Sequence, residues 1–282
     1  MDVSTATTTL NDGRVIPLLA LGVYQIKEGK DTFQSVSNAF SFGVRHIDSA
    51  ALYGNEKSVG EAIEASKVKR SNLFITTKLW VLDFEIGQNP YQFARDEAEI
   101  SIKKLGSIPD LYLIHSPHHG KQNRLAFYRA LCDMKTEGKL KSIGVSNYGV
   151  QHINEIVAAK LPLPAVNQIE CHPFLQQNKI VKHCEKLGIK IQAYSPLARA
   201  KKRVMSNSTL QKIGKKYGKT VAQILIRWSL EKGFITLPKS VHSERIKENS
   251  LVFDFSLSES DMKELALLDE GLHTGWDPTT VK

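Results

Sequence analysis

The sequence predicts an α/β fold in which eight parallel strands and the helices between them close into a (β/α)8 TIM barrel. A short apolar, β-branched run, then a polar loop, then a helical pattern recurs eight times along the 282 residues. The apolar runs are nearly continuous, which is typical of strands covered on both faces in a parallel sheet. Eight such units favour closure of the sheet, and the chain is long enough for one barrel.

The expected strands are residues 19–24, 44–48, 73–78, 111–115, 142–146, 165–168, 190–194 and 235–238. Amphipathic helical patterns separate most of them. Residues 31–43 form one such pattern, which ends on Gly43. Residues 220–233 form another, with Thr220 as the expected N-cap and Gly233 at its end. Glycine in this position is typical of a helix that stops in a left-handed residue.

Two short runs around Asn11-Asp12-Gly13 come before the first unit. An Asp-Gly pair between such runs is a strong signal for a β-hairpin. We expect this N-terminal β-hairpin to close the bottom of the barrel. Because no linker-like stretch interrupts the eight units, residues 1–282 are interpreted as a single domain.

The composition excludes several classes of partner. The net charge is +9, but the densest basic cluster, at residues 201–203, is short and lacks interleaved aromatic residues. The start resembles no signal peptide, and no apolar run reaches the ~18 residues of a membrane span. We therefore expect a cytoplasmic protein with no nucleic-acid or membrane partner.

The cysteines and histidines do not predict a metal site. The three cysteines form no C-x-x-C pair, which is typical of a reducing compartment. Two groups could in principle supply ligands: residues 171–172 with 183–184, and the histidines at 115, 118 and 119. Neither has the ligand spacing of structural zinc modules, so no metal is expected.

Polar side chains recur where the expected strands end. They are Asp48, Lys78, His115, Ser146, Asn147, Gln168, Tyr194, Lys239 and Ser240. Barrel enzymes build their active sites at this end of the strands, so the sequence predicts one common pocket. Asp48, Lys78 and His115, together with Tyr53, supply the acid, ammonium, imidazole and phenol needed to give a proton to a carbonyl oxygen. Each of the four also has an ordinary structural interpretation, as a helix cap, strand end, buried histidine or turn residue.

Seven segments resemble the successive signatures of the aldo-keto reductase family, in the same order. They are VRHIDSAALYGNEKSVGEAI, ITTKLW, LYLIHSP, KSIGVSNY, VNQIECHPF, QAYSPLA and LPKSVHSERIKEN. The short IHSP form and compact C-terminus look most like fungal NADPH-dependent carbonyl and aldehyde reductases. The resemblance implies reduction of aldehydes and ketones to alcohols by hydride transfer from a reduced nicotinamide.

The resemblance also implies a role for each member of the tetrad. Tyr53 would be the general acid, because a contact with the Lys78 ammonium would lower its pKa from ~10. Asp48 would keep Lys78 charged and oriented. His115 would orient and polarise the carbonyl, as a neutral donor rather than as the main acid.

Cofactor binding cannot rest on the common dinucleotide fingerprint. No G-x-G-x-x-G follows a strand, and GKKYGKT at residues 214–220 is one residue too short for a Walker loop. The resemblance implies other NADPH contacts. Ser146, Asn147 and Gln168 would contact the carboxamide of the nicotinamide, and Tyr194 would lie on its ring. Gly22, Val23, Tyr24, Ser195 and Leu197 would lie near the pyrophosphate, and the remaining contacts would be Asp48, Lys239, Ser240, Val241, Arg245, Glu248 and Asn249. An ammonium and a guanidinium converging on the 2′-phosphate favour NADPH over NADH.

The expected substrate contacts are Tyr24, Tyr53, Trp80, His115 and Ser116. Ser116 and Tyr24 stand where the family often has larger aromatic residues, so less aromatic bulk is expected near the carbonyl. Trp276 in the tail would either close over substrate or pack locally.

Two other functions remain open at this point. One is a cofactor-sensing binding module resembling the β subunits of potassium channels. The other is a lyase barrel with a Schiff base on Lys78 or Lys239, which Asp48 disfavours because it would keep Lys78 protonated. The sequence leaves the carbonyl substrate and its stereochemistry open, and a monomer or weak homodimer is expected.

Overall fold

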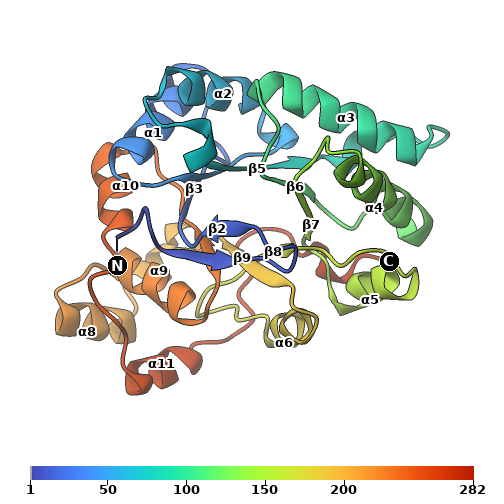
Figure 1. The fold of residues 1–282 in the computed structure, drawn as a ribbon. Helices are drawn as coiled ribbons and strands as arrows, with labels where there is room; N and C mark the ends of the chain where they lie inside the picture. Colours follow the sequence, from blue (N-terminus) through green and yellow to red (C-terminus); the bar gives the residue numbers. More distant parts are fainter. Residues whose placement is uncertain (1) are drawn as a thin grey trace.

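The computed structural model describes residues 2–282, and a ring of eight parallel strands, β3 to β10, forms its centre (Figure 1). The strands are β1 (Thr7–Thr9), β2 (Val15–Pro17), β3 (Ala20–Gly22), β4 (His46–Asp48), β5 (Phe74–Leu79), β6 (Leu111–Ile114), β7 (Ser142–Ser146), β8 (Val166–Glu170), β9 (Lys190–Tyr194) and β10 (Ile235–Leu237). A parallel bridge between Leu19 and Thr236 joins the two outer strands. The predicted (β/α)8 barrel is confirmed.

Helices surround the strands and alternate with them along the chain. They are α1 (Lys30–Ser41), α2 (Glu56–Ala65), α3 (Pro90–Leu105), α4 (Gly120–Thr136), α5 (Val150–Ala158), α6 (Asn178–Lys186), α7 (Lys202–Met205), α8 (Ser208–Tyr217), α9 (Val221–Glu231), α10 (Ser243–Ser250) and α11 (Glu259–Ala266). The predicted helix ends are confirmed: Gly43 follows α1 with φ of 87°, and the Thr220 side chain accepts a hydrogen bond from the Gln223 amide at the start of α9. No helix in the described part of the chain is long and apolar enough to cross a membrane.

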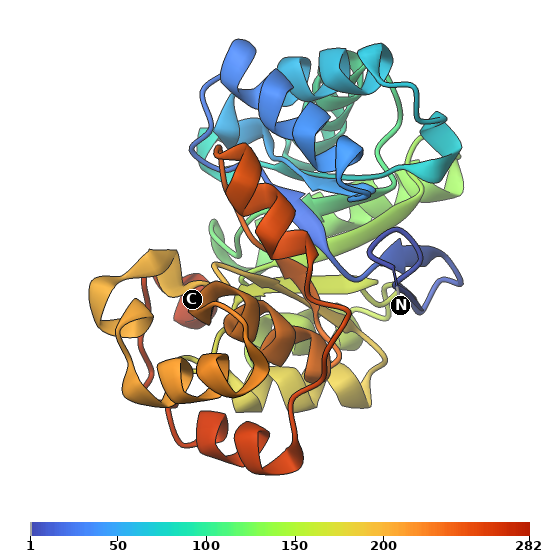
Figure 2. The same ribbon diagram turned by 90° about the vertical axis from the view of Figure 1, so that its left-hand side faces the viewer.

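The predicted hairpin, β1 with β2, closes the N-terminal end of the barrel. Leu10 and Ile16 are buried in the same apolar cluster as residues of the barrel strands. Asn11 Nδ2 donates to the Pro164 carbonyl just before β8 at 2.9 Å, and Asp12 Oδ2 accepts from Ser142 Oγ at the start of β7 at 2.7 Å. Figure 2 shows this hairpin at one end of the barrel and the C-terminus at the other.

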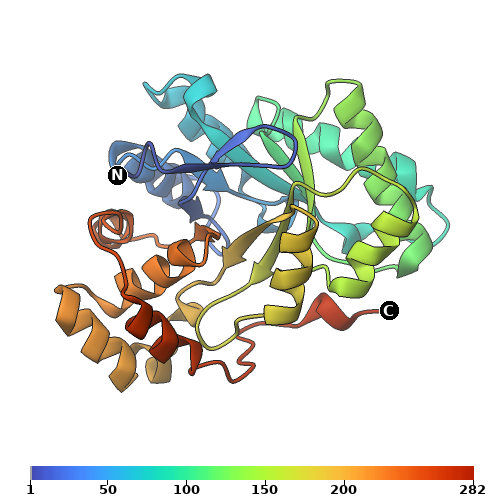
Figure 3. The same cartoon turned by 60° about the horizontal axis from the view of Figure 1, so that its bottom comes forward.

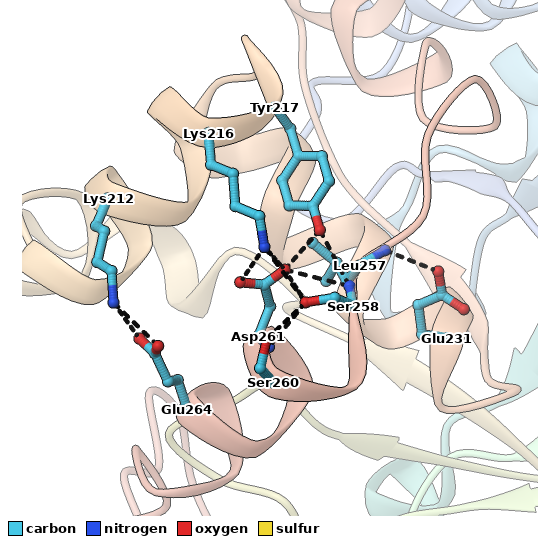
Figure 4. Close-up of polar contacts among 9 residues, drawn as sticks. All are labelled: Lys212, Lys216, Tyr217, Glu231, Leu257, Ser258, Ser260, Asp261 and Glu264. Carbon is cyan, nitrogen blue, oxygen red and sulfur yellow. Dashed lines mark hydrogen bonds and ion pairs between the residues drawn. The ribbon is translucent and has the colours of Figure 1, made fainter.

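A cluster of polar contacts fastens α11 to α8 and α9 (Figure 4). Asp261 accepts hydrogen bonds from Lys216 Nζ at 2.8 Å, from Tyr217 OH at 2.5 Å and from Ser258 Oγ at 2.6 Å. Burial opposes ionisation of Asp261, but these donors outweigh it and lower the pKa of the carboxyl group below its usual value. The contacts hold the segment that leads into the C-terminal tail.

The tail, residues 271–282, crosses the C-terminal end of the barrel and finishes beside α5 (Figure 3). The Thr274 amide donates to Glu170 Oε1 at the end of β8 at 3.0 Å. Gln151 Nε2 donates to the Thr279 carbonyl at 2.7 Å, and His152 Nε2 lies 2.6 Å from the Val281 carbonyl. These contacts place the tail at the same end of the barrel as the polar strand termini.

Replacing Ile16 by Ala tests whether the hairpin contributes to the core. Ile16 is fully buried, so we expect a loss of ~2–5 kcal/mol in the free energy of unfolding. Val15 in the same strand is 57% exposed, and Val15→Ala should cost less than ~0.5 kcal/mol. Urea unfolding followed by circular dichroism measures both. Equal losses would contradict a closing role for the hairpin.

Candidate active site

A cavity of ≈ 560 Å³ opens at the C-terminal end of the barrel strands. Thirteen of the predicted site residues line it: Gly22, Tyr24, Asp48, Tyr53, Trp80, His115, Ser146, Asn147, Gln168, Tyr194, Ser195, Leu197 and Lys239. They come from the first strand of the barrel, from the last, and from most of those between. The strand ends therefore converge on one cavity, because closure of the barrel brings them to a common rim.

The ammonium of Lys78 lies buried beneath the cavity and has three hydrogen-bond acceptors. Lys78 Nζ donates to Asp48 Oδ1 at 2.7 Å, to the Ser49 carbonyl at 2.8 Å and to Tyr53 OH at 3.2 Å. An ammonium has three N–H groups, so these acceptors use all of its donors. Burial lowers the pKa of Lys78, and the negative charge of Asp48 opposes that shift.

The phenol of Tyr53 sits on the cavity wall above Lys78, whose Nζ lies 4.8 Å from the ring centre. Burial, and after it the negative charge of Asp48, raise the pKa of Tyr53 well above its usual value. This differs from the lowered pKa expected from a nearby ammonium, because burial and the negative charge of Asp48 both disfavour the phenolate. The phenol is therefore protonated at neutral pH.

The imidazole of His115 faces the same cavity from the end of β6. It packs edge-on against Tyr53 at 5.7 Å and against Trp80 at 5.1 Å between ring centres. Burial, and then the positive charge of Lys78, lower the pKa of His115 well below its usual value. Within residues 2–282 its buried Nδ1 has no hydrogen-bond partner. The ring is thus neutral at physiological pH.

Amide and hydroxyl groups from β7, β8 and β9 form the opposite wall. Ser146 Oγ donates to the Gln168 carbonyl at 2.9 Å, and Asn147 Nδ2 donates to the His115 carbonyl at 2.9 Å. Tyr194 OH donates to Asn147 Oδ1 at 2.9 Å. Asn147 has φ of 63°, a left-handed conformation that Asn tolerates better than most residues. These hydrogen bonds hold the side chains of Ser146, Asn147 and Tyr194 in place along the cavity.

The residues after β10 are divided between the cavity and the surface. Lys239 lines the cavity, whereas Arg245 is an exposed residue of α10 and Val241 is 43% exposed. Ser240 is buried and its Oγ accepts from the His242 amide at 3.1 Å. Glu248 accepts from Thr220 Oγ1 at 2.5 Å. Asn249 is also buried, near a small separate hollow beside β3.

Two predicted residues lie behind the cavity wall. The Val23 side chain is fully buried in the apolar cluster beside α1, while its amide donates to the Asp48 carbonyl at 3.0 Å and its carbonyl accepts from Asn55 Nδ2 at 2.9 Å. Ser116 is fully buried too, and its Oγ lies 2.8 Å from His118 Nδ1. In this structure the Ser116 side chain therefore faces His118 rather than the cavity, and its contact with substrate stays a prediction.

Aromatic bulk reaches the cavity from the tail. Trp276 lines the cavity, with its ring centre 6.3 Å from that of Trp80 and stacked 5.2 Å from that of His118 at an interplanar angle of 13°. The aromatic wall expected to be missing at Ser116 is therefore supplied by Trp276. Trp276 thus packs locally against His118 and Trp80 and is 45% exposed, and its closure over substrate stays a prediction.

Several lining residues were not predicted. Leu52 and Leu82 lie in short 3₁₀ turns, and Arg199 follows β9 with φ of 52° and its guanidinium 6.0 Å from the Tyr24 ring centre. Turn residues carry no periodic signal, so these three were not visible in the sequence. Gln192, which is buried and does not line the cavity, was not predicted either, although a polar residue two positions before Tyr194 in an apolar strand shares its face.

The family of the chain follows from direct comparison. A family model described as "Aldo/keto reductase family" matches residues 19–270. The chain therefore belongs to the aldo-keto reductase family, a family of oxidoreductases. Relatives include an uncharacterized oxidoreductase of Bacillus subtilis and one of Schizosaccharomyces pombe, each 41% identical over 97% of this chain and 96% of the relative. The fission yeast relative agrees with the fungal resemblance, and the bacterial one is equally similar.

Other relatives have more specific names. The methylglyoxal reductase DkgA of Yersinia pestis is 42% identical over 95% of each chain. The structure of an aldo-keto reductase enzyme from a deep-sea metagenome library has a TM-score of 0.91 and 39% identity, covering 98% of this chain and 99% of the other. A Bombyx mori aldo-keto reductase in complex with NADP has a TM-score of 0.85 and 34% identity, covering 95% and 94%.

The low pKa of His115 predicts an imidazole that does not titrate in the ordinary range. An unfolded His gains a proton as the pH falls through ~6.5, whereas the buried ring does not, so folding stability is lost as the pH falls below that value. The NMR resonance of the His115 ring should stay constant from about pH 8 to about 5.5. His115→Asn assigns the signal by its disappearance. A titration midpoint near pH 6.5 for this resonance would contradict the lowered pKa of His115.

Proposed function

We propose that this protein reduces aldehydes and ketones to alcohols with NADPH, as a single domain, with Tyr53 as the general acid. The observation that carries this proposal is the contact of Tyr53 OH with the buried Lys78 ammonium at the floor of the cavity, 3.2 Å away. Asp48, Lys78 and His115 complete the site around it. Membership of the aldo-keto reductase family supports carbonyl reduction.

The direction of the Lys78–Tyr53 hydrogen bond explains how Tyr53 would act. Because an ammonium only donates, the Tyr53 oxygen accepts, and the phenolic proton is free to point toward the cavity. The raised pKa keeps that proton in place until a carbonyl oxygen takes it. As the phenolate forms, Lys78 stabilises it with a charge-assisted hydrogen bond. Asp48 holds Lys78 in this position.

His115 would orient the carbonyl group of the substrate. Its ring lies beside Tyr53 on the cavity wall, so one carbonyl oxygen can be reached by both side chains. A neutral imidazole can donate one hydrogen bond without competing with Tyr53 as the acid. Tyr24 and Trp80 would contact the remainder of the substrate, with Trp276 beside them.

The residues of the cavity fit a nicotinamide cofactor, which supplies the hydride when it is bound. Ser146, Asn147 and Gln168 present hydroxyl and amide groups suited to a carboxamide, and Tyr194 presents an aromatic ring beside them. Lys239 and the exposed Arg245 provide cations for a phosphate beyond the end of β10. Gly22, Tyr24, Ser195 and Leu197 also line the cavity, and together with Val23 they would lie near the pyrophosphate. Ser240 would contact the same phosphate, the adenine contacts would come from Glu248 and Asn249, and Val241 would complete the cofactor contacts.

Small dicarbonyl compounds are the first substrates to consider, because a relative that covers nearly the whole chain is named a methylglyoxal reductase. The Schiff-base alternative is weaker in this structure. Burial lowers the pKa of Lys78 in the direction that a Schiff base needs, but all three N–H groups are already held by acceptors. No observation favours the cofactor-sensing alternative over turnover.

Tyr53→Phe removes the proposed acid and leaves the cofactor contacts in place. We expect kcat for methylglyoxal to fall by more than about tenfold, which is ~1.4 kcal/mol, with the Kd for NADPH unchanged. NADPH oxidation at 340 nm and fluorescence titration measure the two quantities. Tyr91→Phe, which removes a surface phenol bonded to Asp133, is the matched control. A variant that kept over a tenth of kcat would refute the role of Tyr53.

Lys239→Ala and Arg245→Ala test the preference for NADPH. Each removes a cation proposed to contact the 2′-phosphate, so the KM for NADPH should rise by about tenfold while the KM for NADH stays nearly constant. Lys247→Ala, an exposed lysine of the same helix as Arg245, serves as the control. Equal losses with both cofactors would show that these residues do not read the 2′-phosphate.

A further inference from the structure

Four hydrogen bonds form a continuous chain across the barrel interior. Lys78 Nζ donates to Tyr53 OH at 3.2 Å and to Asp48 Oδ1 at 2.7 Å. Gln168 Nε2 donates to Asp48 Oδ2 at 2.7 Å and to Gln192 Oε1 at 2.9 Å. Gln192 is fully buried in β9, paired in register with Gln168 of β8, and lies outside the cavity wall. This series of hydrogen bonds thus joins Tyr53, the proposed acid, to Gln192, a glutamine that cannot contact a ligand directly.

The polarity of this chain is determined by its charged members. An ammonium only donates and an ionised carboxylate only accepts, so Asp48 must receive a hydrogen from the Gln168 amide. The second hydrogen of that NH2 group then needs an acceptor, which is Gln192 Oε1. Both Gln168 hydrogens are thereby used inside the barrel. The carbonyl oxygen is the part of the Gln168 amide that remains for the cavity.

Gln192 keeps its Oε1 on Gln168, and within residues 2–282 its own buried Nε2 is left without a hydrogen-bond partner. Turning the amide over would give Nε2 a different position, but it would set one NH2 group against the other. An unpaired donor is therefore the consequence of keeping Oε1 on Gln168, since buried polar groups otherwise find partners.

We propose that Gln192 is a positioning residue that keeps the Gln168 carbonyl directed at the cofactor carboxamide, so that the site selects a hydrogen-bond donor at that position. This inference rests on the proposed use of a nicotinamide cofactor. It predicts that Gln168 reads the NH2 group of the carboxamide, and that this discrimination depends on a side chain one strand away.

A cofactor analogue without the NH2 group tests the proposal. In 3-acetylpyridine adenine dinucleotide phosphate a methyl ketone replaces the carboxamide. The wild-type protein should bind NADP+ about tenfold more tightly than this analogue, as expected for one lost hydrogen bond. In Gln192→Leu the Gln168 amide keeps its bond to Asp48, but its second N–H loses the inner acceptor, so the amide can tilt about that bond and offer this N–H to the cavity. The ratio of the two Kd values should then fall to within about twofold.

Titration calorimetry measures both Kd values, and circular dichroism checks that each variant is folded. Gln192→Glu keeps an acceptor oxygen at the same length and should retain the wild-type ratio. Thr236 lies in β10, the strand next to β9, and Thr236→Val breaks its buried hydrogen bond to Ser229 of α9 without touching Gln168, so this variant should also retain the ratio. If Gln192→Leu does not fold, Gln192→Met, of similar length without an amide, takes its place.

The outcomes separate this proposal from the proposed function. A folded Gln192→Leu or Gln192→Met that weakens both ligands equally, and so keeps the ratio, would overturn the positioning role. Equal affinities of the wild-type protein for NADP+ and its analogue would overturn it as well, with cofactor use intact. A wild-type protein that binds neither ligand would overturn the proposed function itself.

Discussion

The buried ammonium of Lys78 is the constraint around which the site is organised. A charge taken out of water is very costly unless acceptors replace its hydration, and here a carboxylate, a main-chain carbonyl and a phenol do so. These acceptors belong to Asp48 at the end of β4, Ser49 after it and Tyr53 in the next turn. The charge therefore determines where the end of β4, its loop and β5 lie relative to one another.

The same loop is also fastened to the first strand of the barrel. Asn55 is fully buried, accepts from Ser49 Oγ at 2.9 Å, and donates to the carbonyls of Val23 at 2.9 Å and Ile26 at 3.0 Å. The segment after β3 is thus held against the segment that carries Tyr53. These hydrogen bonds act together with the apolar cluster that contains Val23 and Ile26 and against which Tyr53 packs. Each of the buried amide and hydroxyl groups needs a partner where water is excluded, so the bonds set the relative positions of the two cavity edges.

Much of this architecture can be predicted from sequence, for identifiable reasons. The apolar, β-branched runs locate every barrel strand to within about two residues, since strand faces covered on both sides need such side chains. Side chains at strand ends, such as Asp48 and Ser146, follow from topology alone. Gln192 lies further inside, so position at a strand end does not reveal it. Thr274 meets Glu170 across 104 residues of sequence, and such long-range pairing leaves no local pattern. Ser116 turns away from the cavity because its hydroxyl group pairs with His118.

The C-terminal tail contributes to the cavity wall separately from the barrel strands, both in the order of synthesis and in how freely its residues can be exchanged. Trp276 lies near the end of the 282-residue chain, so during synthesis every barrel strand leaves the ribosome before this part of the cavity wall exists. The tail belongs to no strand and is held by local contacts to Glu170, Gln151 and His152. Exchanges in these residues can therefore reshape the Trp276 side of the cavity while the contact between Lys78 and the proposed acid Tyr53, which comes from earlier strands and turns, stays as it was.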